Sequence, residues 1–172
     1  MASSGPDFTM TDFLAGLTHT VRPGEQRPLV VHDDELSTIP AGAVPNPTTL
    51  RIAGQLPTAT FELFRQTIPA GQSSDMQRHY HETVHYVITG DGHSEIEAGD
   101  GTETVGWSAG SFIYTPPWAW HRHYNDSPEL PVEFLTIENS RLLGLFGLAR
   151  RESAGLATFT EARARFDHQE ET

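Results

Sequence analysis

The stretch MQRHYHETVHYVITGDG, residues 76–92, contains three histidines within seven residues. Side chains along a β-strand alternate between its two faces, so every second residue of a regular strand points the same way. The side chains expected to share one face are those of Gln77, His79, His81, Thr83 and His85. The same strand runs on into the apolar sequence YVIT, which is typical of a core strand. Two explanations stay open: the polar row faces solvent, or it faces inward and binds a metal.

A second histidine cluster lies in GSFIYTPPWAWHRHYND, residues 110–126. His121 and His123 again share one face of an expected strand, and the Pro-Pro and Trp residues before them favour a rigid turn. A barrel interior is normally apolar, and imidazole supplies nitrogen ligands without burying net charge. Two histidine pairs on separate strands therefore favour one internal metal site over two solvent-exposed faces.

Composition limits the classes of protein that this chain can belong to. It has 172 residues, no cysteine, and 11 basic against 23 acidic residues, which gives a formal charge of -12. The length predicts one domain, and the absence of cysteine excludes disulfides and thiolate metal sites. The acidity disfavours a nucleic-acid or anionic-membrane surface. No apolar run approaches the ~20 residues of a membrane helix, and the start lacks a secretory pattern, so we expect a cytoplasmic protein.

The chain divides into three segments by composition. Residues 1–47 are rich in proline and glycine and are expected to form an N-terminal arm. Residues 48–139 contain short alternating segments separated by Gly, Asn, Asp and Pro, which predicts an all-β sandwich or barrel. Residues 140–172 predict a C-terminal helical tail, with helices over 140–151 and 158–169. All three segments are expected to belong to one domain overall.

The second histidine cluster resembles the second motif of the cupin family, which reads G, five residues, P-X-G, two residues, H, three residues, N. Gly110, Pro116, His121 and Asn125 fall at this spacing. Trp118 stands in the place of the motif's second glycine. The match therefore departs from the cupin pattern at one position.

The first cluster resembles the first cupin motif, G, five residues, H-X-H, three or four residues, E, six residues, G, in two incompatible registers. In the first register His79 and His81 form the H-X-H pair, His85 replaces the glutamate, and Gly92 closes the motif. This register offers nitrogen ligands at every ligand position.

In the second register Gly71 opens the motif and Gly90 closes it, while Gln77 and His79 stand for the histidine pair and Thr83 for the glutamate. The hairpin pattern favours this register, whereas ligand chemistry favours the first, which we prefer. A slip of two residues keeps the same face but changes every ligand. A bulge near residue 82 would reconcile the two registers.

The resemblance implies a double-stranded β-helix, the jelly-roll cupin barrel, with a metal inside. The run PPWAWHRHYND is similar to the gentisate and salicylate ring-cleaving dioxygenases. By that resemblance His121 is an iron ligand and His123 an acid/base or substrate-orienting group. In the second register His85 falls where those enzymes keep an arginine for the substrate carboxylate. Those enzymes are also longer, with two cupin halves.

We therefore expect a non-haem Fe(II) dioxygenase acting on a small aromatic or enolisable acid, with Mn, Ni or Zn as alternative metals. The alternatives are an O₂-independent isomerase, cyclase or lyase on a small metabolite, and a non-catalytic small-molecule-binding cupin. The apolar stretch RLLGLFGL, residues 141–148, predicts either a cover for the barrel or a homodimer contact. The expected metal ligands are His79, His81, His85 and His121; the expected catalytic residues are His123 and His85; the expected pocket residues are Gln77, Trp118, Trp120 and Tyr114.

Overall fold

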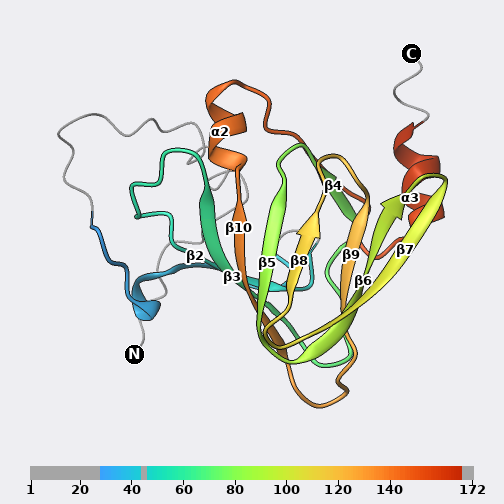
Figure 1. Cartoon of the computed structure of the whole chain (residues 1–172), viewed down its shortest axis with the longest axis horizontal. Coiled ribbons are helices and arrows are strands. Elements are labelled where there is room, and N and C mark those ends of the chain that lie inside the picture. Colours follow the sequence, from blue (N-terminus) through green and yellow to red (C-terminus); the bar gives the residue numbers. More distant parts are fainter. Residues whose placement is uncertain (1–27, 44–45, 168–172) are drawn as a thin grey trace.

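The computed structural model describes residues 28–43 and 46–167, and it contains two antiparallel sheets that face each other (Figure 1). The six-stranded sheet has the order β1-β2-β3-β10-β5-β8, and the five-stranded sheet has the order β11-β4-β9-β6-β7. The strands of the first sheet are β1 (Ser37–Ile39), β2 (Thr49–Ile52), β3 (Glu62–Ile68), β5 (Thr83–Thr89), β8 (Phe112–Thr115) and β10 (Val132–Glu138). The strands of the second are β4 (Gln77–His79), β6 (Asp91–Ala98), β7 (Gly101–Ser108), β9 (His121–Asn125) and β11 (Arg151–Ser153).

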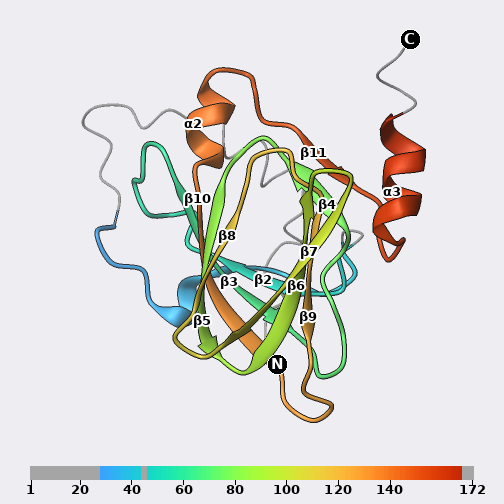
Figure 2. The ribbon, with the colours of Figure 1, turned by 45° about the vertical axis from the view of Figure 1, so that its right-hand side comes forward.

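The two sheets enclose a jelly-roll barrel, which confirms the all-β prediction (Figure 2). Alternating apolar side chains from both sheets meet at one end of the barrel and exclude water there. This core consists of Ile68, Val87, Trp107, Ile113, Val132 and Phe134. The polar inward row lies beyond this core. The apolar end of the barrel therefore stabilises the fold, and the polar end can form a binding site. No helix among residues 28–43 and 46–167 is long and apolar enough to cross a membrane.

The histidine-rich stretch is not one strand but two. β4 ends at His79 in the five-stranded sheet, and β5 begins at Thr83 in the six-stranded sheet, so the chain changes sheets across residues 80–82. Alternation nevertheless persists through the crossing, because His81 is buried while Tyr80 and Glu82 are exposed. The expected inward row is therefore right, and the expectation of one continuous strand over this stretch is wrong.

The N-terminal part of the described chain contributes to the sheet. A 3₁₀ turn, η1 (Asp33–Glu35), precedes β1, which pairs with β2. β1 lies within the segment expected to be an arm, so the sheet begins before residue 48. Residues 1–27, on which most of that expectation depends, are outside the described residues.

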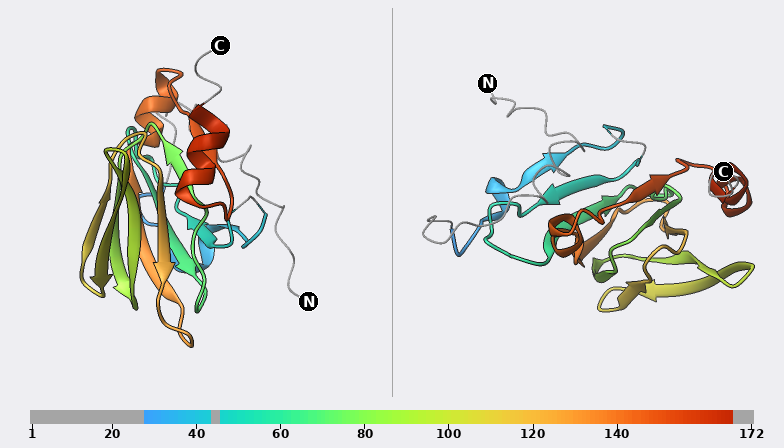
Figure 3. Two further views of the ribbon diagram at one scale, coloured as in Figure 1. Left: turned by 90° about the vertical axis from the view of Figure 1, so that its right-hand side faces the viewer. Right: turned by 90° about the horizontal axis from the view of Figure 1, so that it is seen from above.

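Both predicted C-terminal helices are present, but the first is shorter than expected. α2 (Ser140–Leu145) gives way to a turn at Gly147, whose φ of 70° favours glycine. The chain then forms β11 instead of continuing the helix to residue 151. α3 (Phe159–Phe166) begins at a capping box between Thr158 and Glu161, and it lies on the outside of the five-stranded sheet (Figure 3).

The exposed side chains after α2 bear on the expected homodimer. Leu145, Phe146 and Leu148 are 42%, 70% and 54% exposed, so they do not cover the barrel of their own chain. Apolar side chains that are close together on a surface favour a protein contact. The homodimer stays a prediction.

Asn125, at the end of the second cupin motif, is buried and links the end of β3 to the loop between β9 and β10. Its amide nitrogen donates to the carbonyls of Ile68, Pro69 and Leu130 at 2.8–3.0 Å, and its Oδ1 accepts from Ser127 N at 2.9 Å. The asparagine of the motif therefore has a structural role here, because its side chain binds backbone groups of neighbouring segments.

We expect Asn125→Ala to lower the free energy of unfolding by about 1–3 kcal/mol, because buried carbonyls lose their donor. Urea unfolding followed by tryptophan fluorescence measures the change. Asn139→Ala is the matched control, since its amide bonds to the exposed Glu82 at 3.1 Å. Equal losses in the two variants would contradict the assignment.

Candidate metal and substrate site

A small cavity opens between the two sheets at the polar end of the barrel. Its free volume is about 50 Å³. The residues that line it are Asn46, Leu50, Ile52, Phe64, Gln66, Gln77, His79, His81, Thr83, His85, His121, Glu138 and Arg151. One wall is therefore apolar, from β2 and β3, and the other carries imidazole, amide and charged groups.

The structure brings together all four expected ligands and Gln77 at this cavity. β4 and β9 supply His79 and His121, whose rings meet edge to face with centroids 4.8 Å apart. The crossing segment supplies His81, which stacks on His79 at 3.7 Å, and β5 supplies His85. The clustering follows from the pairing of β4 with β9, in which Gln77 lies opposite His121.

Backbone carbonyls fix the tautomers of two of these histidines. His79 Nδ1 donates to His81 O at 2.7 Å, and His121 Nδ1 donates to Ala119 O at 2.9 Å. A carbonyl oxygen only accepts, so each Nδ1 carries the proton and each Nε2 is left with a lone pair. A metal-binding histidine is held in the same way. His85 Nδ1 lies 2.9 Å from the hydroxyl of Thr136, which also leaves its Nε2 uncommitted.

Burial keeps these imidazoles neutral at physiological pH. It lowers the pKa of His85 to about 4 and the pKa of His121 to about 3. It also lowers the pKa of His79 and of His123 well below 6.5, and neighbouring histidines add to both shifts. Neutral imidazole is the form that binds a metal, so protons do not compete for these nitrogens at pH 7.

His81 is turned toward a buried carboxylate. Its Nε2 lies 3.1 Å from Glu138 Oε2, and both side chains are nearly inaccessible to solvent. Burial acts to raise the pKa of Glu138, but its interactions with His81 and Ser140 outweigh burial and lower that pKa. Glu138 is therefore ionised, and the pair places an imidazole hydrogen-bonded to a carboxylate on the cavity wall.

His123 lies behind the cavity and does not line it. Its ring is 4.6 Å from that of His85 and packs on Phe134, and its Nδ1 lies 2.7 Å from the hydroxyl of Ser94. That hydroxyl also accepts from Trp107 Nε1 at 2.9 Å. His123 Nε2 is buried and has no hydrogen-bond partner among the described residues. Any acid/base role for His123 therefore depends on its contacts with the lining residues His85 and His121.

The donor chemistry fits a divalent metal, and the present positions of the donors do not complete its shell. His79 and His121 each offer an oriented Nε2, and Thr83 Oγ1 and Glu138 Oε1 are buried polar atoms on the cavity wall with no partner among described residues. Within residues 28–43 and 46–167, no three histidine or acidic side chains are gathered closely enough to hold one metal ion. A third protein ligand therefore requires a side chain to rotate.

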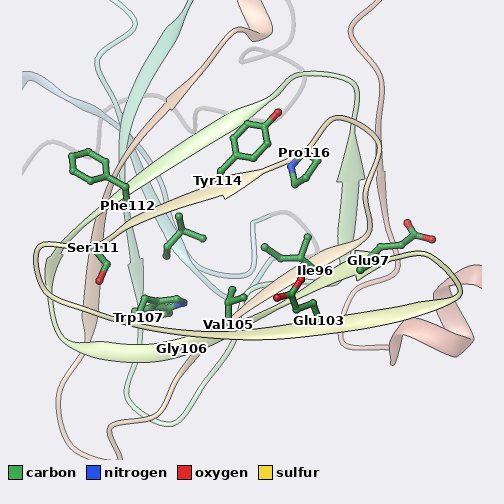
Figure 4. A pocket seen from close by; sticks show the side chains of 12 residues that line it. Ile96, Glu97, Glu103, Val105, Gly106, Trp107, Ser111, Phe112, Tyr114 and Pro116 are labelled. Atoms are coloured by element: carbon green, nitrogen blue, oxygen red, sulfur yellow. The ribbon is translucent and has the colours of Figure 1, made fainter.

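The three aromatic residues expected in the pocket lie elsewhere, which corrects that expectation. Tyr114 is 50% exposed, donates to Glu82, and lines an outer groove of about 470 Å³ between the edge strands β7 and β8 (Figure 4). Trp120 is fully buried under α3, where it packs on Phe166. Adjacent residues of an extended chain point to opposite faces, so Trp120 points outward because the neighbouring His121 points inward.

Trp118 takes the conformation that the cupin motif reserves for glycine. Its φ is 60°, and it is the only residue other than glycine with positive φ among those described. Such a backbone is costly for a bulky residue. The indole is held against Tyr80 and between the guanidinium groups of Arg78 and Arg150, at 4.3, 4.4 and 4.6 Å. These contacts offset the backbone cost and keep Trp118 on the outer face.

The two closing glycines explain why both registers of the first motif match. Gly90 has a φ of 89° in the turn between β5 and β6. A Cβ on Gly92 would lie 2.0 Å from Tyr124 O and 2.6 Å from the ring of Trp107. Each position requires glycine for its own reason. The opening glycine of the second register, Gly71, also occupies a turn with positive φ, while the histidines of the first register line the cavity.

Two charged cavity residues were not identified from the sequence. Glu138 shares the inward face of β10 with Phe134 and Thr136, and that alternation was a usable signal. Arg151 comes from β11, within a segment that reads as helix, so no local pattern marks it. Asn46 and Gln66 complete the polar lining.

Comparison with known proteins identifies one domain of the chain. Residues 64–138 match the model of the cupin domain. A curated relative, gentisate 1,2 dioxygenase 1 from Aquipseudomonas alcaligenes, is 32% identical over 90 residues, which are 52% of this chain and 25% of that protein. The chain thus spans about a quarter of the length of this relative.

Solved structures agree on the fold. Salicylate 1,2-dioxygenase from Pseudaminobacter salicylatoxidans superposes with a TM-score of 0.57 at 16% identity, over 68% of this chain and 33% of that chain. A cupin-2 domain protein from Rhodospirillum rubrum superposes with a TM-score of 0.57 at 19% identity, over 86% of this chain and 91% of that chain. Residues 64–138 of the chain therefore form a cupin domain.

Proposed function

We propose that this cupin domain binds a divalent metal in the histidine-lined cavity and acts as a non-haem Fe(II) dioxygenase on a small acid. The observation that carries the proposal is the pair His79 and His121, whose Nδ1 protons are held by carbonyls so that both Nε2 atoms are free. The similarity to gentisate 1,2 dioxygenase 1 supports the oxygenase class. Bound there, the metal supplies Lewis-acid and redox chemistry.

The remaining histidines have distinct proposed roles. His85 is the third ligand or the substrate contact, since its Nε2 is uncommitted. His81 joins the ligands only if it turns away from Glu138, and in its present position it holds a proton between cavity and carboxylate. His123 buttresses His85 and exchanges a proton with the site through it. The apolar wall of Leu50, Ile52 and Phe64 excludes water from the reacting groups.

Cavity size favours the smaller of the expected substrates. The free volume of about 50 Å³ is smaller than the ~150 Å³ of an engineered cavity that holds benzene. An aromatic acid therefore requires side chains to move, whereas a short enolisable acid requires less movement.

One observation favours the second candidate, an O₂-independent isomerase, cyclase or lyase. The His81–Glu138 pair on the cavity wall is a suitable proton donor and acceptor for enolisation. With the same metal acting only as a Lewis acid, this chemistry needs no O₂. The non-catalytic binding protein is the outcome if neither reaction occurs.

Metal analysis of the full-length chain, purified without chelator or affinity-tag histidines, tests the site. We expect about one metal ion per chain, and we expect His79→Ala and His121→Ala each to lower occupancy at least about tenfold, because each removes a ligand. His93→Ala is the control, since His93 pairs with Asp126 at the surface. Full occupancy in both site variants would reject the metal site.

The identity of the metal and the need for O₂ then separate the two enzymes. Iron, together with O₂ uptake in the presence of short 2-oxo or hydroxy acids, supports the dioxygenase. Zinc or nickel with turnover under anaerobic conditions supports the second candidate. If the metal is manganese, O₂ consumption during turnover supports the dioxygenase, and turnover without O₂ consumption supports the second candidate.

A further inference from the structure

We infer that Arg151 binds the carboxylate of the substrate, which makes the ligand of this cavity a small carboxylic acid anion. The inference deepens the proposed function and depends on it only in taking the histidine-lined cavity as the substrate site. Arg151 is the only lysine or arginine among the residues that line this cavity. No short motif around residue 151 points to such a role.

Strand pairing places the guanidinium beside the histidines. β11 pairs antiparallel with β4, and Arg151 lies directly opposite His79. On the other side of β4, Gln77 lies opposite His121. Residues directly opposite each other on neighbouring strands point to the same face of the sheet. The inner face of the five-stranded sheet therefore carries a cation next to two neutral imidazoles.

The guanidinium is oriented from behind by buried partners. Arg151 Nη2 donates to Asp75 Oδ2 at 2.6 Å, and Arg151 Nε donates to Gln77 Oε1 at 2.8 Å. Asp75 is completely buried and also accepts from the hydroxyl of Ser153 at 2.6 Å. Arg151 Nη1 forms no hydrogen bond with a described residue, so one amino group of a fixed fork is left to bind a ligand oxygen.

The charges in the cavity are suited to an anion at this end. Three of the lining histidines, His79, His85 and His121, are neutral at pH 7 and supply no positive charge. Glu138 is the acidic lining residue, but it belongs to β10 of the opposite sheet and is paired with His81. A carboxylate at Arg151 would thus bind to the five-stranded sheet, with the rest of a small ligand directed toward the opposite sheet.

Arg151 also has a structural role, because it neutralises Asp75. Removing the arginine alone would leave a buried carboxylate without its partner, which is strongly destabilising. The double variant Arg151→Gln/Asp75→Asn removes both charges and keeps polar groups in both places. Arg151→Lys keeps the positive charge but removes the forked donor geometry of the guanidinium. Arg150→Gln is the matched control, since Arg150 is an exposed neighbour that stacks on Trp118 outside the cavity.

The test is NMR titration of the full-length, isotope-labelled chain with acetate and with acetamide, its uncharged analogue. It is run on the protein as purified and again after metal removal, so that acetate bound to a metal is recognised. We expect the wild type to prefer acetate, and the double variant to raise the acetate dissociation constant at least about tenfold with little change for acetamide. Arg151→Lys should be intermediate, and Arg150→Gln should stay within about twofold of the wild type.

Equal acetate affinity in the wild type and the folded double variant would overturn the inference, as would the lack of saturable acetate binding to the wild type. Metal content measured on the same samples separates this result from the proposed function. If the double variant keeps its metal and its acetate affinity, only the role of Arg151 is rejected, and the proposed metal site stands. Arg151-dependent acetate binding in a chain that binds no metal rejects the metal enzyme and keeps the anion site.

Discussion

Acidification of the metal-free protein from about pH 6.5 to about pH 4 is expected to remove several kcal/mol from its free energy of unfolding. His85 titrates near pH 4 and His121 near pH 3 because burial lowers the pKa of each from 6.5. In this pH range the unfolded chain binds protons that the folded chain does not, so stability falls as the pH falls. One pKa unit corresponds to about 1.4 kcal/mol, so His85 alone accounts for about 3 kcal/mol at pH 4.

The pKa values of His79 and His123 are lowered in the same direction, so both residues add to this loss. Glu138 adds to the loss at the acid end, because its lowered pKa means that protonation weakens the folded state. We therefore expect the metal-free protein to unfold before pH 4.

Urea unfolding with chelator present, repeated at several pH values, measures this dependence. His85→Gln removes one titrating group and should flatten the slope of stability against pH, whatever its effect at pH 7. His93→Gln is the control, because His93 lies at the surface beside Asp126 and outside the cavity. A stability that is constant between about pH 6.5 and 4 would show that these histidines are protonated in the folded protein.

Arg141→Met is expected to lower the free energy of unfolding by about 3–5 kcal/mol, since it leaves a buried carboxylate without its cation. Arg141 Nε and Nη2 bind the two oxygens of Glu62 at 2.6 and 3.1 Å, and both side chains are buried. The same guanidinium donates to the carbonyls of Gly54, Leu56 and Thr58, so it also holds the loop before β3.

The register of the sheet increases the cost of this substitution. Glu62 on β3 lies directly opposite Glu138 on β10, so two buried carboxylates are neighbours. Like charges in opposite positions destabilise a sheet unless each has its own partner. Arg141 is the partner of Glu62, and His81 is the partner of Glu138.

A double-mutant cycle with Glu62→Gln measures the pair by urea unfolding. The variant Glu62→Gln/Arg141→Met should lose less stability than Arg141→Met, because no buried charge is left unpaired. Arg163→Met is the control: Arg163 pairs with Asp167 at 3.0 Å on the surface of α3 and should cost less than about 1 kcal/mol. A loss in Arg141→Met as small as in the control would contradict a buried pair.

Features that depend only on residues close together in the chain are predictable from the sequence. Alternation with a period of two needs only the extended backbone, so the inward row of Gln77, His79, His81 and His85 was predictable although the strand is broken. The second motif likewise aligns His121, which lines the cavity, and Asn125, which ends β9. The all-β class followed from strand length and turn residues.

Contacts between residues far apart in the chain depend on how the strands pair. Arg151 reaches the cavity because β11 pairs with β4, and Glu138 meets His81 because β10 pairs with β5. Three aromatic residues expected in the pocket, Trp118, Trp120 and Tyr114, lie outside it. The turn at Trp118 directs its side chain to the outer face, and strand alternation places Trp120 and Tyr114 on the face opposite to the cavity. Strand register is set by contacts far apart in the chain. A local pattern therefore gives the face of a residue, and the pairing of strands gives its neighbours.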